Sequence, residues 1–241
     1  MAASGAVSPV QLLRDGTAQA TGQAAIAEAA RLMEDGKVVA IPTDTVYGLA
    51  ASLRSPAALQ EIFRLKGRSG QKSLPVLLAD AATATRLIDV AAPGDRGDPD
   101  DPDWLLEFAL RYWPGALTMA LPAAPGLPPE VLAGDGTVGL RVPDSVIARE
   151  VIRRSGGALA VTSANRSGHP PALDARTVRE QLGDAGLRWV LDGGPGIAGV
   201  PSTVVGRDGD RLVVHRAGAI DSVSLERTWA VLRAVRAGGA G

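Results

Sequence analysis

The sequence contains no cysteine, and its only histidines are His169 and His215. The absence of cysteine excludes disulfide bonds, thiolate catalysis and cysteine-ligated zinc. Two histidines in this arrangement form no cluster with metal-ligand spacing, so we expect no metal held by protein side chains. No apolar run approaches the roughly 20 residues that a membrane-spanning helix requires. Met1–Asp15 lacks the basic and apolar segments of a secretory signal, so we expect a cytoplasmic protein without a membrane segment.

Aromatic residues and net charge are also scarce. Aromatic residues make up only 3% of the chain, and the formal net charge is −1. Such a chain has no global basic field that would draw it to nucleic acid or to an anionic membrane, so any anion site must be local. The 241 residues are 46% hydrophobic and 21% charged, which suits one globular domain with a substantial core.

Lysine is almost absent, yet two of the three lysines fall in one short string, KGRSGQK at residues 66–72. A lysine ammonium is a compact point charge, whereas an arginine guanidinium is a planar fork, and the two are not interchangeable at an anion site. The string therefore indicates local binding of phosphate or carboxylate. The alternative is a solvated basic turn that follows a helix.

Hydrophobic periodicity predicts helices that alternate with strands. Helices are expected over about 25–33, 55–66, the Ala-rich stretch ending near Ile88, 104–112, 145–154, 177–182 and 225–235. Strands are expected over about 38–41, 74–78, 116–121, 138–142, 158–162, 189–191, 203–205 and 212–215. Because strands alternate with helices early and cluster late, the predicted fold class is α/β, an open, twisted, mixed β-sheet flanked by helices.

The domain organisation follows from composition. We expect a loose N-terminal segment over 1–20, a single domain over 21–236 and a disordered tail over 237–241. Residues 91–103 are acidic and rich in proline and glycine, which predicts an exposed loop within the domain.

Polar strings stand at the ends of several predicted strands. They are PTDTVYG at 42–48, KGRSGQK at 66–72, WPGALT at 113–118, Arg141 within 138–143, TSANRSG at 162–168, PST at 201–203 and HRAG at 215–218. Ligands of open α/β sheets bind in the crevice beyond the strand ends, so these strings are candidates for one shared pocket. Each also has a structural explanation: a turn or a helix cap for the hydroxyl and amide groups, and an ion pair for Arg141.

Residues 134–139 (GDGTVG) match the glycine pattern of dinucleotide-binding loops. That pattern requires a strand before it and a helix after it. Here a predicted strand follows instead, so we interpret this stretch as a glycine turn without nucleotide-binding significance.

Taken together and in this order, the strings resemble the YrdC-like family of threonylcarbamoyl-adenylate synthases. The resemblance covers about residues 25–220. Its main features are K-x-R at Lys66 and Arg68 and S-x-N at Ser163 and Asn165. The PTDTVYGL string, WPG-x-LT and SAN-x-SG-x-P match as well.

The resemblance implies a YrdC-like fold, a twisted sheet around a large positively charged cavity, in its single-domain form. It implies synthesis of L-threonylcarbamoyl-adenylate from ATP, L-threonine and bicarbonate/CO2, with release of pyrophosphate. A tRNA threonylcarbamoyl transferase complex would then modify the adenosine beside the anticodon. Weak binding of tRNA or double-stranded RNA is a further expectation.

The resemblance also implies roles for individual residues. The expected catalytic residues are Lys66, Arg68, Ser163 and Asn165. The expected ATP contacts are Arg68, Lys72, Thr118, Ser163, Asn165 and Arg216. The expected L-threonine contacts are Thr45, Arg141 and Ser202. Mg2+ would bridge the phosphates with few protein ligands, because magnesium retains waters.

Two positions depart from the family pattern: Ser69 stands where many relatives have proline, and Leu77 stands near a histidine that contacts threonine in some relatives. Two other functions remain open. One is a non-catalytic RNA-binding or ribosome-associated module. The other is a carbamoyl-transfer relative resembling hydrogenase-maturation proteins, which carry zinc-finger modules that a cysteine-free chain lacks.

Overall fold

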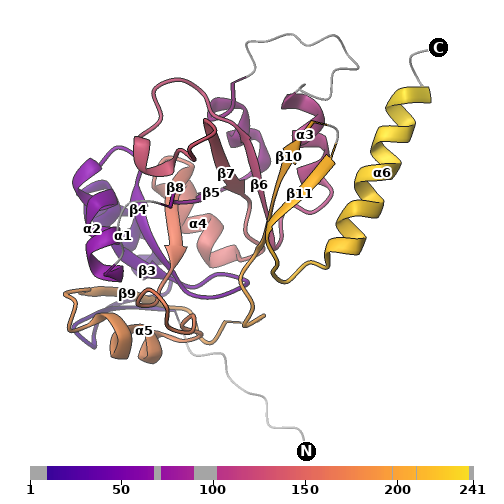
Figure 1. Cartoon of the computed structure of the whole chain (residues 1–241). Coiled ribbons are helices and arrows are strands. Elements are labelled where there is room, and N and C mark those ends of the chain that lie inside the picture. Colours follow the sequence, from indigo (N-terminus) through magenta and orange to yellow (C-terminus); the bar gives the residue numbers. More distant parts are fainter. Residues whose placement is uncertain (1–9, 68–71, 90–101, 197, 210, 239–241) are drawn as a thin grey trace, which may run out of the picture.

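The computed structural model describes residues 10–67, 72–89, 102–196, 198–209 and 211–238 (Figure 1). The helices are α1 (Gly22–Glu34), α2 (Pro56–Lys66), the 3-10 helix η1 (Ala81–Arg86), α3 (Pro102–Leu110), the 3-10 helix η2 (Pro129–Val131), α4 (Val146–Arg154), α5 (Ala175–Leu182) and α6 (Ser222–Gly238). The strands are β1 (Gln11–Arg14), β2 (Thr17–Thr21), β3 (Val39–Ile41), β4 (Gly48–Ser52), β5 (Val76–Leu78), β6 (Leu117–Pro122), β7 (Thr137–Arg141), β8 (Ala158–Ser163), β9 (Trp189–Asp192), β10 (Thr203–Asp208) and β11 (Arg211–Arg216).

All strands of the described residues join one sheet in the order β11-β10-β6-β7-β5-β8-β4-β3-β9-β1-β2. The pairs β6–β10, β5–β7 and β3–β9 are parallel, and the other pairs are antiparallel. The sheet is therefore open and mixed, as the sequence predicts. Its order also places strands that are far apart in the sequence side by side, such as β10 and β6.

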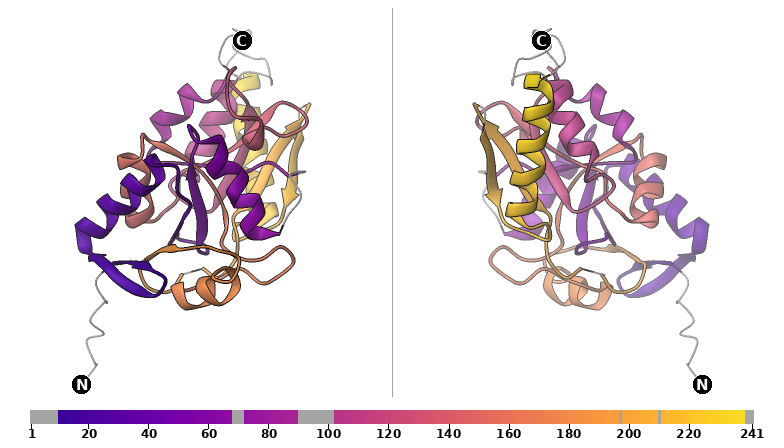
Figure 2. Two further views of the ribbon diagram at one scale, coloured as in Figure 1. Left: turned by 90° about the vertical axis from the view of Figure 1, so that its left-hand side faces the viewer. Right: turned by 90° about the vertical axis from the view of Figure 1, so that its right-hand side faces the viewer.

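Helices cover the sheet in two groups, each with its own hydrophobic core. The first core takes buried residues from α2, α3, α5 and α6, and the second takes them from α1 and α4. Figures 1 and 2 show α6 at the end of the sheet that lies away from α1. Along the chain a strand's side chains alternate between the two cores, as in β4, where Leu49 belongs to the first and Ala50 to the second.

Helix α2 begins and ends where its sequence predicts. The Ser55 side chain accepts a hydrogen bond from the backbone N–H of Ala58, and Pro56 occupies the first turn, where its missing N–H costs nothing. Gly67 adopts a left-handed conformation with φ of 60° and ends the helix. This termination fixes Lys66 in the last helical turn.

The sequence did not indicate strand β4, although it lies fully buried between β3 and β8. Its residues, GLAAS, have low intrinsic strand propensity. Packing requires glycine at position 48, because a Cβ atom there would lie 2.5 Å from Val161 Cγ1. Tertiary packing thus outweighs local propensity here.

Three further expectations need correction. The segment 1–20 is not loose throughout, because residues 11–14 and 17–21 form β1 and β2, and β1 pairs with β9. The Ala-rich stretch forms the 3-10 helix η1. The expected loop 91–103 ends earlier, because α3 begins at Pro102, and residues 90–101 lie outside the described residues.

At the other end of the chain, α6 extends to Gly238, beyond the expected start of the tail at residue 237, and residues 239–241 lie outside the described part. Among the helices of the described residues, none combines the length and apolar character needed to cross a bilayer.

The packing of α6 on α3 gives a test of the fold. The ring of Trp229 lies 4.3 Å from the ring of Trp104 and 5.1 Å from that of Phe108, measured between centroids. We expect Trp229→Ala to lower the free energy of unfolding by about 3–5 kcal/mol. Val231 on the same helix is 58% exposed, so Val231→Ala should change stability by less than about 0.5 kcal/mol. Urea unfolding followed by circular dichroism measures both, and equal losses would contradict this packing.

Candidate active site

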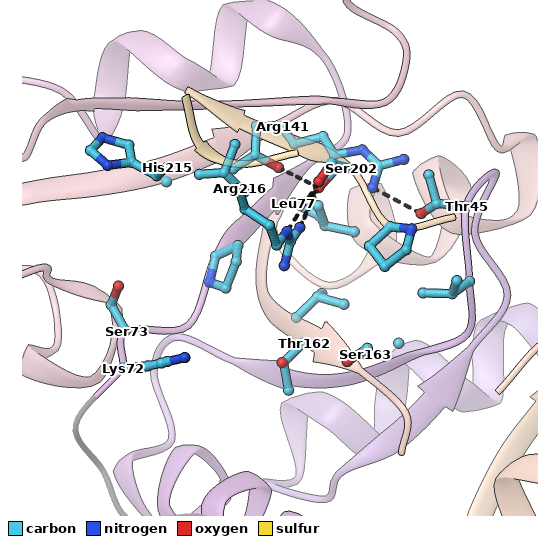
Figure 3. A pocket seen from close by; sticks show the side chains of 18 of the residues that line it. Thr45, Lys72, Ser73, Leu77, Arg141, Thr162, Ser163, Ser202, His215 and Arg216 are labelled. Carbon is cyan, nitrogen blue, oxygen red and sulfur yellow. Dashed lines mark hydrogen bonds between the residues drawn. The ribbon is translucent and has the colours of Figure 1, made fainter. Parts of the chain in front are cut away.

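A cavity of about 980 Å³ opens beside the sheet (Figure 3). It is lined by the β3–β4 connection, the end of α2, strands β5 to β8, the η2–β7 loop, and β10 and β11. Leu77 and Val161 line it and also belong to the core beneath α1 and α4. The cavity therefore continues the face of the sheet that these two helices cover.

The predicted site residues converge on this cavity. Those that line it are Thr45, Lys66, Lys72, Thr118, Arg141, Ser163, Asn165, Ser202 and Arg216. Arg68 lies outside the described residues. The fold brings together residues that are up to 171 positions apart in the sequence, from Thr45 to Arg216. The binding role of each residue stays a prediction.

Arg141 is a buried cation of the cavity that is held by three hydrogen bonds. Its side chain is 5% exposed. Nε donates to the Gly115 carbonyl at 2.8 Å, Nη1 donates to Thr45 Oγ1 at 3.0 Å, and Nη2 donates to Asp44 Oδ1 at 2.6 Å. Burial lowers the pKa of Arg141, and the Asp44 carboxylate opposes that shift. The guanidinium is thus held in one orientation, with a second N–H on each terminal nitrogen available to a planar anion.

The ion pair with Asp44 bears out the structural explanation of Arg141, but it does not exclude a ligand. A guanidinium carries five N–H donors, and these three hydrogen bonds use one each. Asp44 lies inside the PTDT string, yet the sequence alone gave no reason to pair it with a residue 97 positions away.

The hydroxyl of Thr45 has a defined direction. Thr43 Oγ1 donates to the Val46 carbonyl at 2.6 Å and lies 3.0 Å from Thr45 Oγ1. Because a hydroxyl has one proton, Thr45 must donate to Thr43 in that contact. Thr45 Oγ1 also accepts from Arg141, so its remaining capacity is as an acceptor. It suits an N–H group of a ligand.

Ser202 joins Thr118 and Arg216. Ser202 Oγ lies 2.9 Å from Thr118 Oγ1 and accepts from Arg216 Nη2 at 3.0 Å. Arg216 Nη2 also donates to the Ser202 carbonyl at 2.8 Å. Burial lowers the pKa of Arg216, and the positive charge of Arg141 lowers it further. Two arginines that repel each other across one cavity create a local site for anions in a chain of net charge −1.

Lys66 is buried and holds the loop that follows β8. Its Nζ donates to the Ser163 carbonyl at 2.5 Å and to the Asn165 carbonyl at 2.9 Å. Asn165 in turn donates to the carbonyls of Arg166 and His169. The sequence predicts that Lys66 supplies charge to the pocket, and the structure adds that it positions the Ser163–Asn165 turn.

Figure 3 shows Lys72 and Ser73 on the side of the cavity opposite Arg141 and Arg216. The cations therefore surround the space from more than one side. Sequence reasoning missed two cavity-lining features: the residues Ala133, Gly134, Asp135 and Thr137 of the glycine turn, and Leu77 as part of the floor. His215 belongs to the HRAG string that the sequence analysis already made a candidate for the pocket. Leu77 had been noted only as a departure from the family pattern, and nothing local signals that a strand residue will face a cavity.

Comparison with known proteins identifies the family. The Sua5/YciO/YrdC family model, described as telomere recombination, matches residues 31–218. The chain belongs to this family. The resemblance inferred from the sequence motifs is thereby confirmed.

Relatives within the Sua5/YciO/YrdC family carry a consistent name. The chain is 39% identical over 207 residues to the threonylcarbamoyl-AMP synthase of Bacillus subtilis, covering 86% of this chain and 57% of that protein. It is 37% identical over 171 residues to the threonylcarbamoyl-AMP synthase of Thiobacillus denitrificans, covering 70% and 84% respectively. The structure of Pyrococcus abyssi Sua5 complexed with L-threonine matches with a TM-score of 0.75 at 32% identity, covering 87% of this chain and 58% of that one. The chain thus spans just over half of the Bacillus and Pyrococcus proteins.

The Lys66 contacts generate a test. Lys66→Met removes the donor that holds two carbonyls and should lower the free energy of unfolding by about 1–3 kcal/mol, because those acceptors lose a partner. Lys37→Met, at an exposed position, is the matched control and should change stability little. Thermal and chemical unfolding of both variants measures these changes in the free energy of unfolding. Equal stability of the two would show that Lys66 does not hold the loop.

Proposed function

We propose that this protein synthesises L-threonylcarbamoyl-adenylate from ATP, L-threonine and bicarbonate/CO2, and releases pyrophosphate. The observation that carries the proposal is the buried Arg141, oriented by Asp44 and Thr45 at one end of a cavity whose remaining walls carry Arg216, Lys66 and Lys72. This arrangement suits one substrate with a carboxylate and another with phosphates. The relatives named threonylcarbamoyl-AMP synthase support the same assignment.

Threonine would bind through its carboxylate to the terminal N–H groups of Arg141, which form a bidentate fork. Thr45 Oγ1, which can only accept further hydrogen bonds, would accept from the threonine nitrogen. Ser202 would supply a further hydroxyl contact. Thr118, Ser163, Asn165, Arg216, Lys72 and Arg68 would hold the nucleotide.

The reaction needs little acid–base help from the protein. The threonine amine adds to CO2 and loses a proton, which forms a carbamate anion. A carbamate oxygen then attacks the α-phosphorus of ATP, and the bond to the β-phosphate oxygen breaks, so pyrophosphate leaves with that electron pair. Because the nucleophile is already an anion, the site must mainly orient the two substrates and neutralise their charges. The clustered arginines and lysines fit that task.

Mg2+ would enter with the phosphates of ATP. Among the described residues, no three His, Cys, Asp or Glu side chains gather into a metal-binding group. The cavity lining is mainly cationic and hydroxylic, with the carboxylate of Asp135 beside them, which fits a magnesium ion held mostly by phosphate oxygens and waters. The product would then pass in the cytoplasm to a transferase that modifies tRNA.

The RNA-binding alternative has less support. The chain has a net charge of −1, and aromatic residues for base stacking are few. The carbamoyl-transfer alternative is likewise less favoured, because the relatives compared above are named as synthases.

The function itself is tested by pyrophosphate release from ATP. We expect release only when both L-threonine and bicarbonate are present, together with a product of the mass of threonylcarbamoyl-AMP. A folded protein that binds ATP without threonine-dependent release would reject the synthase and favour the RNA-binding module.

The role of Arg141 is tested by calorimetry. Arg141→Ala should weaken threonine binding by at least about thirtyfold, or about 2 kcal/mol, while ATP binding persists. Arg176→Ala, which removes a side chain that is 78% exposed, is the control and should bind threonine normally. The double variant Asp44→Asn/Arg141→Met removes both charges, so that misfolding caused by an unpaired Asp44 is not mistaken for lost binding. Unchanged threonine affinity in a folded Arg141 variant would remove it from the site.

A further inference from the structure

Strand β11 contains a β-bulge at the cavity. Arg216 pairs with Val204, and Val214 pairs with Val205, so His215 lies between two consecutive pairs without a partner of its own. In a regular strand, neighbouring side chains point to opposite faces. The bulge removes that alternation, and His215 and Arg216 both line the cavity.

The imidazole of His215 has a defined seat on the sheet. A Cβ atom built on Gly206 would lie 2.4 Å from His215 Nε2 and 3.1 Å from its Cδ2. The ring therefore occupies the space that a side chain at position 206 would fill. The Cβ atom of Ala120 lies 3.4 Å from that same position above Gly206, so Ala120 borders the space that the ring occupies. Two features of separate strands, the bulge and the missing side chain, thus place one ring at the cavity wall.

The surroundings of His215 differ from the rest of the cavity. Ala120 borders the ring, Gly139 is paired with Ala120 on the neighbouring strand β7, and Pro75 lies against Gly139, so this part of the lining is small and apolar. Asp135 also lines this part, and its Oδ1 accepts from the backbone N–H of Thr137 at 3.1 Å and from its hydroxyl at 2.7 Å. These hydrogen bonds lower the pKa of Asp135, and His215 lowers it slightly further, so the carboxylate is ionised at neutral pH.

Figure 3 shows His215 at the end of the cavity opposite Thr45. If threonine occupies the Arg141 and Thr45 end, the α-phosphate must lie next to it, because the carbamate attacks there. Two parts of ATP then remain, the pyrophosphate and the adenosine. An ionised Asp135 repels the pyrophosphate, whereas a small apolar floor beside a planar ring suits a purine base.

We propose that His215 is a substrate-binding residue that stacks against the adenine base of ATP, in the part of the cavity lined by Ala120 and Asp135. This inference rests on the proposed synthase function for the position of the threonine. It gives a role to His215, for which the family resemblance implied none.

Calorimetric titration with ATP and with inorganic tripolyphosphate tests this assignment, because the two ligands differ by the adenosine. His215→Leu should weaken ATP binding about tenfold, the size expected when a base loses its stacking partner, and leave tripolyphosphate binding unchanged. His215→Phe should restore ATP binding, since it keeps a planar ring. Arg211→Leu is the control, because Arg211 is exposed on the same strand and does not line the cavity.

Two results would overturn the proposal. Wild-type ATP affinity in His215→Leu would show that the side chain only fills space. Loss of ATP and tripolyphosphate binding in both His215→Leu and His215→Phe, with recovery in His215→Arg, would show that the side chain acts through charge. These titrations need no catalysis, so a failure of threonine-dependent pyrophosphate release would reject the proposed function without deciding the role of His215.

Discussion

The site depends on one buried cation. Arg141 connects its own strand, β7, to the β3–β4 connection through Asp44 and Thr45, and to the segment before β6 through the Gly115 carbonyl. A guanidinium removed from water is stable only where carboxylates and carbonyls replace its hydration. The three segments must therefore stay in register around Arg141, and that register sets the shape of one end of the cavity.

The other cations are placed at an energetic cost that an anionic ligand would offset. Arg216 faces the same cavity as Arg141; burial lowers the pKa of Arg216, and the positive charge of Arg141 lowers it further. The Lys66 ammonium donates hydrogen bonds to the carbonyls of Ser163 and Asn165. A charge on α2 therefore holds the turn that carries these two residues. A chain of net charge −1 thereby concentrates positive potential where phosphates are proposed to bind.

Local signals were sufficient for much of the fold. Helix α2 was predictable because Ser55, Pro56 and Gly67 are an N-cap, a first-turn proline and a C-terminal glycine, and each acts within a few residues. Strand β4 and the N-terminal strand β2 were not. The sequence GLAAS has low strand propensity, and TAQAT contains no hydrophobic alternation of buried residues, so both form strands because neighbouring strands supply hydrogen-bonding partners.

The sequence by itself determined the fold class and the motifs of the Sua5/YciO/YrdC family. Periodicity, helix caps and the order of the polar strings are local properties that can be read directly from the amino-acid sequence. Only the tertiary structure decided how those strings meet. Arg141 pairs with Asp44 across 97 residues, and Lys66 of α2 holds the Ser163–Asn165 turn after β8. The bulge that turns His215 and Arg216 toward the same cavity arises from the register of β11 against β10. Strand order and register create these contacts, and no short stretch of sequence encodes them.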